Sequence, residues 1–423
     1  VAALIHAKPE EIIFTCGSTE SSNMIIKGVA DYKKYYEKLG NHIITSKTEH
    51  HATLNTCRFL NGEIYSNHDA TFSLNGQSNK VDRGYEVTFL DVDSYGRVLP
   101  DTLSNAIRPT TTLITIMWAN NEIGTINDIS ALCDVAHQNG VLFHTDATQI
   151  SGKLSINVKD TPVDFMSLSA HKFHGPKGVG AAYIRSDEYG LPPITAFMHG
   201  GEQEFGIRAG TLAVHNIVGF GKAAELALAH QEECTRRLQE IDKAARALFA
   251  SEPQFELLGD PDTHIPGLLS IVVHRETFDN ERFIKKVSNQ YAISAGSACT
   301  AGEPSHVLQA IGRSNETSRV LRISLSDMSS LNDVKLLIEL LKNIGFNKRV
   351  VNAMSLQDIS FNDTYWSGEN DLINEFYIPC LTESVEYCRA VGYFSSSILC
   401  YITNGLFPFI QNGGKIVFCA AQI

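Results

Sequence analysis

The 423-residue chain is long enough for two or three domains, and its composition is that of an ordinary globular protein, with 43% hydrophobic and 19% charged residues. The net charge of −12 argues against general attraction to nucleic-acid phosphates, and no apolar run is long enough to cross a bilayer. The nine cysteines are scattered without a CxxC pair, which indicates a reducing cytoplasm and argues against a structural zinc site.

The first half of the chain alternates β-branched runs with amphipathic stretches, the pattern of a mostly parallel sheet covered by helices. A helix is predicted to follow Cys16–Glu20 and run through Lys27, and another to cover about Ile129–Gln138. A polar stretch at about 61–84 is interpreted as a surface insertion. Strands are predicted at Glu11–Thr15, Asn41–Ser46, Glu86–Leu90, Leu113–Trp118, Val141–His144, Asp164–Leu168 and Gly180–Ile184.

The second half predicts a long helix over Val214–Leu248 that links two domains, followed by alternating strands and helices to about Asn347. The composition changes near Lys348, and the chain ends on a strand-like run, Lys415–Ala421, with nothing after it to complete a fold. We therefore expect an α/β protein with a large mostly parallel domain at 1–225, a smaller α/β domain at 226–349 and a truncated extra segment at 350–423.

Three polar groups suit a phosphate-bearing aldehyde cofactor. Lys172, between a strand end and a Gly/Pro-rich loop, could bond to an aldehyde, although a solvated lysine is the alternative, and Ser169 and His171 could donate to a phosphate. Asp146 at another strand end could lie beside a pyridine nitrogen, although a helix N-cap is the alternative. Gly17–Glu20, where a strand meets a helix, offers an anion site, although a plain capping box would explain the same residues.

Four more residues add to this set. His50 could stack on a planar cofactor, and Asn121 offers an amide near the same strand ends, although a surface histidine and a simple turn are the alternatives. Cys299 lies among glycine, serine and alanine, which suits a nucleophile that must move. Arg322, on a predicted strand, suits capture of a carboxylate.

These residues, in this order, resemble the cysteine desulfurases of the NifS/IscS type, within the class-V aminotransferase group. The resemblance runs from about Pro9 to Asn347, apart from the insertion. It rests on the stretches TCGSTESSNMIIKG, HIITSKTEHHATLNTCR, NNEIGTINDI, HTDATQISGKL, SLSAHKFHGPKGVGA, MHGGEQEFGIRAGT, SAGSACTAGEPSHVL and RVLRISLS.

The resemblance implies a fold-type I pyridoxal 5′-phosphate (PLP) enzyme that works as a homodimer. Lys172 would be joined to the cofactor, Asp146 and Gln149 would contact its ring, and His50 would stack on the ring and shuttle a proton. The phosphate-binding positions would be Ser18, Thr19, Ser169, His171 and, toward the partner subunit, Thr211. Asn121 and Arg322 would hold the substrate, with Asn121 also near the cofactor, and Cys299 would carry the persulfide.

The implied reaction converts L-cysteine to L-alanine and passes sulfur from Cys299 to an acceptor protein, a scaffold or a thiolation enzyme. The pathway is left open between iron–sulfur assembly, tRNA thiolation and DNA sulfur modification. No resident metal is expected, although Cys299 could transiently ligate an iron–sulfur cluster. A cytoplasmic location is expected, without direct binding to nucleic acid or membrane. The alternatives are a selenocysteine lyase, another class-V PLP enzyme, or an inactive truncated fusion protein.

Three departures from the family pattern accompany the resemblance. The strand and turn that usually open the family are missing, so the large domain is expected to lack its N-terminal segment. The loop from Cys299 to Pro304 is slightly shorter than in the IscS branch. The tail at 350–423 instead resembles the beginning of a phospholipase-D-like module, without the histidine that such a module needs for catalysis.

Overall fold

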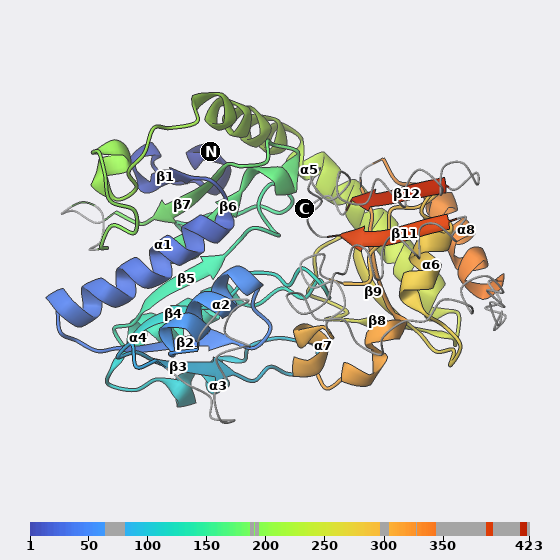
Figure 1. The fold of residues 1–423 in the computed structure, drawn as a ribbon, viewed down its shortest axis with the longest axis horizontal. Helices are drawn as coiled ribbons and strands as arrows, with labels where there is room; N and C mark the ends of the chain where they lie inside the picture. Colours follow the sequence, from blue (N-terminus) through green and yellow to red (C-terminus); the bar gives the residue numbers. More distant parts are fainter. Residues whose placement is uncertain are drawn as a thin grey trace, which may run out of the picture. The chain divides into compact units, whose positions relative to one another are not determined.

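The computed structural model describes residues 1–63, 81–186, 190, 194–296, 304–326 and 328–343, and the backbone of 386–391 and 415–420. A seven-stranded sheet with the order β1-β7-β6-β5-β4-β2-β3 dominates the first half of the chain (Figure 1). Its strands are β1 (Ile12–Thr15), β2 (His42–Ser46), β3 (Glu86–Leu90), β4 (Thr111–Thr115), β5 (Leu142–Asp146), β6 (Phe165–Ser169) and β7 (Gly180–Ile184).

Strands β3, β2, β4, β5 and β6 are parallel, whereas β7 runs antiparallel to both β6 and β1. The predicted, mostly parallel α/β fold is therefore confirmed. Strand β4 ends at Thr115, earlier than the predicted Trp118. Beyond Thr115 the amides of Ile116 and Trp118 still donate to β5, whereas the Met117 amide donates to the Glu49 side chain (2.7 Å).

Helices cover both faces of this sheet. They are α1 (Ser18–Asp31), α2 (His51–Leu60), α3 (Pro100–Ala106), α4 (Ile129–Gln138) and α5 (Val214–Ala250), with short 3-10 turns η1 (Ala2–Ile5), η2 (Pro9–Glu11), η5 (Ala170–Phe173) and η6 (Gln203–Gly206) and a π turn η3 (Tyr32–Tyr36). Neighbouring strand residues alternate between two cores. Ile43 and Leu113 pack with α1 and α2, whereas Ile44 and Ile114 pack with α4 and α5. Because both faces of the sheet are buried, every residue of such a strand enters one core or the other, and the strand is a continuous apolar run in the sequence.

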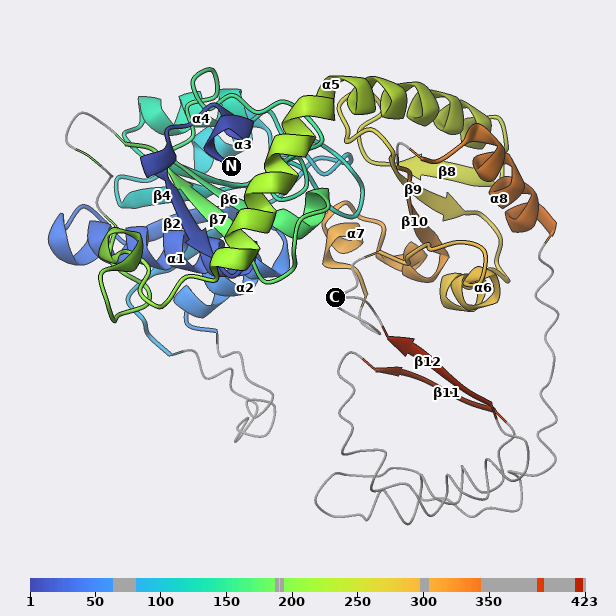
Figure 2. The same ribbon diagram turned by 90° about the horizontal axis from the view of Figure 1, so that it is seen from above.

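A second, antiparallel sheet follows α5, with the order β10-β9-β8. Its strands are β8 (Phe255–Leu258), β9 (Leu268–Val273) and β10 (Val320–Ser324), and α6 (Asn280–Val287), α7 (His306–Ala310), η7 (Ser314–Arg319) and α8 (Leu331–Asn343) accompany them. Figure 2 shows α5 extending from the large sheet to the small one. Both sheets belong to one compact unit, Val1–Gly296 with Pro304–Lys342, so a domain boundary at residue 225 stays a prediction.

The described backbone of the tail consists of β11 (Glu386–Val391) and β12 (Lys415–Ala420), which pair in parallel in a separate unit. The strand predicted at Lys415–Ala421 corresponds to β12. Most of the insertion predicted at 61–84 lies outside the described residues. Within the described part of the chain, no helix combines the length and the apolar character that crossing a membrane requires.

Candidate active site

The polar residues predicted from the sequence gather at the carboxyl edge of the large sheet. Strands β2, β5 and β6 are parallel and end at Ser46, Asp146 and Ser169. The turns after parallel strands meet at one edge, which is where open α/β sheets bind their ligands. His50, Gln149 and Lys172 therefore come from turns at the same edge, although they are far apart in the sequence.

The N-terminus of α1 reaches this edge through two glycines. Gly180 pairs with Thr15 on one side and with Ser169 on the other. A Cβ atom at Gly180 would lie 2.6 Å from the Cα atom of Gly17, so only glycine allows β7 to pack against the turn before α1. The approach brings the first turn of α1 beside the end of β6.

This helix N-terminus is open. Its N-cap is Gly17, which provides no side-chain cap, and a Cβ atom built there would meet nothing within 4 Å. Ser18 and Thr19 are the first two helical residues, so neither hydroxyl occupies the N-cap position of the capping box considered above. Uncapped amides and the helix dipole favour an anion at this position.

The turn after β6 adds two polar groups and a lysine. Ser169 Oγ and His171 Nδ1 lie 2.9 Å apart. Burial, together with the charges of Lys172 and Lys177, lowers the pKa of His171, so the imidazole is a neutral hydrogen-bonding group. Lys172, on η5, is exposed.

The turn after β5 supplies a buried carboxylate. Asp146 is 4% exposed, and its Oδ1 atom accepts from the Thr148 amide (2.9 Å), so it does cap its own turn. Gln149 follows in this turn and is partly buried. The hydroxyls of Thr145 and Thr148 are buried without a hydrogen-bond partner among the described residues. Such orphaned polar atoms indicate a place where a polar ligand binds.

The turn after β2 carries His50 at the N-cap of α2. Its Nδ1 atom accepts from the Ala52 amide (3.1 Å). Because a ring nitrogen that accepts a hydrogen bond carries no proton, the neutral ring of His50 bears its proton on Nε2. The neighbouring ring of His51 lies 4.6 Å from that of His306, between ring centroids.

Glu49 in the same turn is fully buried (0% exposed). Its Oε1 atom accepts from the Met117 amide (2.7 Å) and from Ser46 Oγ (3.0 Å), whereas Oε2 is buried without a partner among the described atoms. Burial, with the nearby charge of Asp146, raises the pKa of Glu49 to about 8. Glu49 is therefore a neutral acid at pH 7.

The turn after β4 joins this edge to the small sheet. Asn120 donates to Thr48 O (3.0 Å), and Ser305 Oγ donates to the buried carboxyl of Glu122 (2.6 Å), whose pKa is raised by burial. The guanidinium of Arg322 on β10 donates to the carbonyl oxygen of Asn121 (2.8 Å). The structure therefore brings together the two residues predicted to hold the substrate.

Thr211 is exposed, in a loop attached to the first turn of α1 by a bidentate ion pair between Arg208 and Glu20 (2.7 and 3.2 Å). Cys299 lies outside the described residues, so its predicted role stays a prediction.

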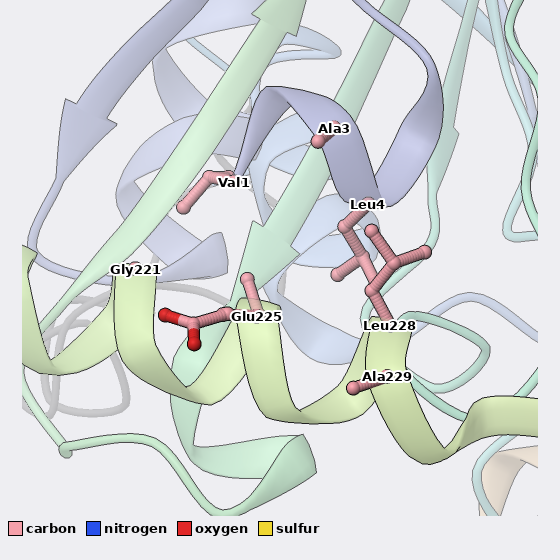
Figure 3. Close-up of a pocket in the computed structure, with 8 residues that line it drawn as sticks. Val1, Ala3, Leu4, Gly221, Glu225, Leu228 and Ala229 are labelled. Carbon is pink, nitrogen blue, oxygen red and sulfur yellow. The ribbon is translucent and has the colours of Figure 1, made fainter.

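An apolar pocket between η1 and α5 contains none of the predicted site residues (Figure 3). Glu256, His274 and Glu316 have metal-ligand spacing, but Arg313 already binds both carboxylates.

Two side chains at this edge were given no role from the sequence. Glu49 and Lys153 both lie within stretches that carry the family resemblance, TEHH and HTDATQISGK, and that is the signal that could have identified them. Burial, with the charges of Lys172 and Arg322, lowers the pKa of Lys153 to about 8. Their unusual ionisation follows from burial and from neighbours distant in sequence.

Taken together, the described residues fit the expected cofactor. PLP requires a phosphate site, a carboxylate at its ring nitrogen and a lysine for its aldehyde. The open start of α1, the buried Asp146 and the exposed Lys172 supply these three features.

Comparison with known proteins agrees with this description. Residues 1–337 match the aminotransferase class-V family. The cysteine desulfurase IscS of Vesicomyosocius okutanii is 42% identical over 318 residues, which cover 75% of this chain and 72% of the relative. A solved NifS-like protein (TM-score 0.67, 29% identity) covers 81% of this chain and 84% of its own. The structure of SspA in complex with cysteine (TM-score 0.61, 35% identity) covers 78% and 85%.

Proposed function

The chain belongs to the class-V aminotransferase family and is a PLP-dependent cysteine desulfurase, and from this premise we propose which residues carry out each part of the reaction. One observation carries the assignment of the site. The open N-terminus of α1, the buried carboxylate of Asp146 and the turn that bears Lys172 meet at one edge of the sheet.

Phosphate binding is assigned to the first turn of α1 and the turn after β6. Ser18 and Thr19 donate through their hydroxyls and helix amides, and Ser169 and His171 donate from the other side. The support for this is the close packing of Gly180 against the turn before α1. The dipole of the 14-residue helix α1 adds to the attraction for the phosphate.

Contacts with the cofactor ring are assigned to three side chains. Asp146 holds a proton on the ring nitrogen, Gln149 donates to the ring oxygen, and His50 stacks on the ring face. When bound, the cofactor supplies an aldehyde that captures the substrate amine and a protonated ring that withdraws electrons from its Cα atom. Lys172 is covalently joined to the cofactor before the substrate arrives.

The substrate is held by Asn121 and Arg322, which bind the carboxylate of L-cysteine. The amine of Lys172 would remove the proton from Cα. His50 moves protons near the substrate thiol; its Nδ1 atom accepts from the Ala52 amide, so Nε2 is the nitrogen that carries the proton in the neutral ring.

Sulfur transfer is assigned to Cys299. Its thiolate attacks the sulfur atom of the substrate, so an S–S bond forms as the Cβ–S bond breaks. The electron pair of the broken bond stays on the substrate carbon, which gains a proton on the way to L-alanine. Cys299 is left as a persulfide, ready for an acceptor.

The test is to incubate the protein, loaded with PLP, with L-cysteine, to measure alanine release and to locate the persulfide by mass spectrometry. The Cys299→Ser variant should keep the yellow cofactor and still bind L-cysteine, while alanine and persulfide formation fall to background. Cys16→Ser is the matched control, because Cys16 is an exposed residue whose thiol is nevertheless desolvated in part, and this desolvation and Glu20 raise its pKa to about 11. Undiminished turnover by Cys299→Ser, or a persulfide on Cys16, would refute the assignment.

We also propose that the enzyme is a homodimer in which Thr211 reaches the phosphate of the partner subunit. The support is a group of exposed apolar side chains near Thr211 in sequence, including Phe205 (68% exposed) and Val218 (65% exposed). Apolar side chains this exposed are typical of surfaces that become buried in an interface.

The acceptor is proposed to be another protein, either a scaffold for iron–sulfur assembly or an enzyme of tRNA thiolation or DNA sulfur modification. The net charge of −12 supports a protein acceptor over direct contact with nucleic acid.

We propose a cytoplasmic location, as the scattered cysteines suggest. The tail at 350–423, with its resemblance to a phospholipase-D-like module, is proposed to play no part in sulfur transfer.

A further inference from the structure

Lys153 lies in the turn that follows Asp146 and Gln149, and a tight contact fixes that turn. Gly152 has φ +73°, and a Cβ atom there would lie 2.6 Å from both Cβ and Cγ of Phe173. Phe173 directly follows Lys172 on η5. The glycine therefore allows the backbone beside Lys153 to pack directly against the residue beside Lys172.

The backbone of Lys153 is held by hydrogen bonds at both its amide and its carbonyl oxygen. Its amide donates to Ile150 O (3.1 Å), and its carbonyl oxygen accepts from Thr235 Oγ1 of α5 (2.6 Å). The side chain is partly buried and starts from a fixed point. A lysine anchored in this way loses less conformational freedom when it binds a ligand than a lysine on a mobile loop.

The electrostatic surroundings of Lys153 favour an anion. Burial is the main cause that lowers the pKa of Lys153 to about 8, and the charges of Lys172 and Arg322, both cations, act in the same direction. In the loaded protein Lys172 holds the cofactor, so Lys153 and Arg322 are the two cationic side chains that repel each other. An anion that arrives between them removes this repulsion and gains charge-assisted hydrogen bonds.

The position of Lys153 relative to Lys172 and Arg322 indicates which anion it binds. In the proposed reaction the substrate amine goes to the aldehyde that Lys172 holds, and its carboxylate goes to Arg322. Both groups are attached to one carbon atom of an amino acid. A cation that acts on both Lys172 and Arg322 therefore lies near the α-carboxylate, whereas the phosphate is assigned to the start of α1.

We propose that Lys153, together with Arg322, binds the α-carboxylate of the amino-acid substrate. The inference rests on the proposed function, and it adds a substrate-binding residue. Arg322 is oriented by its hydrogen bond to Asn121 O (2.8 Å), and Lys153 completes the site from the turn after β5.

The test compares L-alanine with ethylamine, which is L-alanine without its carboxylate. Dissociation constants for both amines are measured from the change in cofactor absorbance, in the PLP-loaded wild type and in Lys153→Met, Lys153→Arg and Lys159→Met. Lys159 is an exposed lysine in the same connection between β5 and β6, so Lys159→Met is the matched control. Neither amine has a thiol, so the measurement does not depend on Cys299.

Lys153→Met should weaken L-alanine binding about tenfold to a hundredfold, the range for one lost hydrogen bond to a charged group, and leave ethylamine binding within about twofold. Lys153→Arg should recover most of the affinity, and Lys159→Met should match the wild type. If Lys153→Met does not retain the cofactor, Lys153→Gln gives the same comparison.

Equal weakening of both amines, or unchanged L-alanine binding, would overturn the assignment of Lys153. A wild type that binds no PLP, or whose cofactor does not respond to L-alanine, would instead refute the proposed function. The two failures are therefore distinguishable.

Discussion

Replacing Glu49 with glutamine tests whether a neutral acid is buried beneath the site. Oε1 of Glu49 accepts two hydrogen bonds, from the Met117 amide and from Ser46, and a glutamine carbonyl oxygen can accept both. The amide NH2 then takes the place of Oε2, which has no partner among the described atoms. Burying this NH2 group without a partner lowers the free energy of unfolding by about 1–3 kcal/mol, and this cost does not depend on pH.

The pH dependence follows from the difference between the two states. The pKa of Glu49 rises from its ordinary value of 4.5 to about 8 in the folded protein. Between these values the folded state keeps a proton that the unfolded chain releases, so the free energy of unfolding falls as pH rises, and it levels off above pH 8. At 1.36 kcal/mol per pKa unit, the wild type should lose about 3 kcal/mol between about pH 5.5 and 8.5 through this group.

The assay is urea denaturation of the cofactor-free protein at several pH values across this window, followed by tryptophan fluorescence. The stability of Glu49→Gln relative to the wild type should rise by about 3 kcal/mol from low to high pH. Glu11→Gln is the matched control. Burial by itself would raise the pKa of Glu11, but hydrogen bonds from Lys8 and Ser186 outweigh it and lower that pKa. The carboxyl of Glu11 is therefore ionised in both the folded and the unfolded state throughout the window. The Glu11→Gln difference should therefore be constant.

A Glu49→Gln difference that does not change with pH would show that the carboxyl is already ionised in the folded protein, and the reasoning from burial would be wrong.

Two further variants test the geometry of the site. Lys172→Ala should lose the link to PLP that borohydride reduces, while Lys177→Ala keeps it, and peptide mapping of the adduct to Lys177 would contradict the assignment. Gly152→Ala should destabilise the protein by about 1–3 kcal/mol in urea denaturation, because the new methyl group meets Phe173 at a positive φ. Gly140→Ala has a similar φ (+69°) with open space around it, so an equal loss there would show that the contact with Phe173 is unimportant.

Much of the large sheet could be predicted from local patterns. The strand at Glu86–Leu90 has the predicted bounds, and the long helix begins at Val214 as predicted and ends two residues beyond the predicted Leu248, at Ala250. Runs of apolar residues predict buried parallel strands wherever helices cover both faces. The strand direction of β7 could not be predicted in this way, because periodicity shows which residues are buried and not which way a strand runs.

The sequence by itself determined the types of residue available for catalysis and the order of the turns that carry them. Asp146, Lys172 and His50 each follow an apolar run, and a strand end is a local signal. Only the tertiary structure decided which of these turns meet, because the sheet order β6-β5-β4-β2 places the ends of strands that are distant in sequence at one edge.

Ionisation was also decided by tertiary structure. Glu49 is neutral at pH 7, and the pKa of Lys153 is lowered, because each loses water to atoms from distant segments and lies near charges that are remote in sequence. Desolvation and Coulomb interactions depend on distance in space, and no pattern along the chain contains that distance.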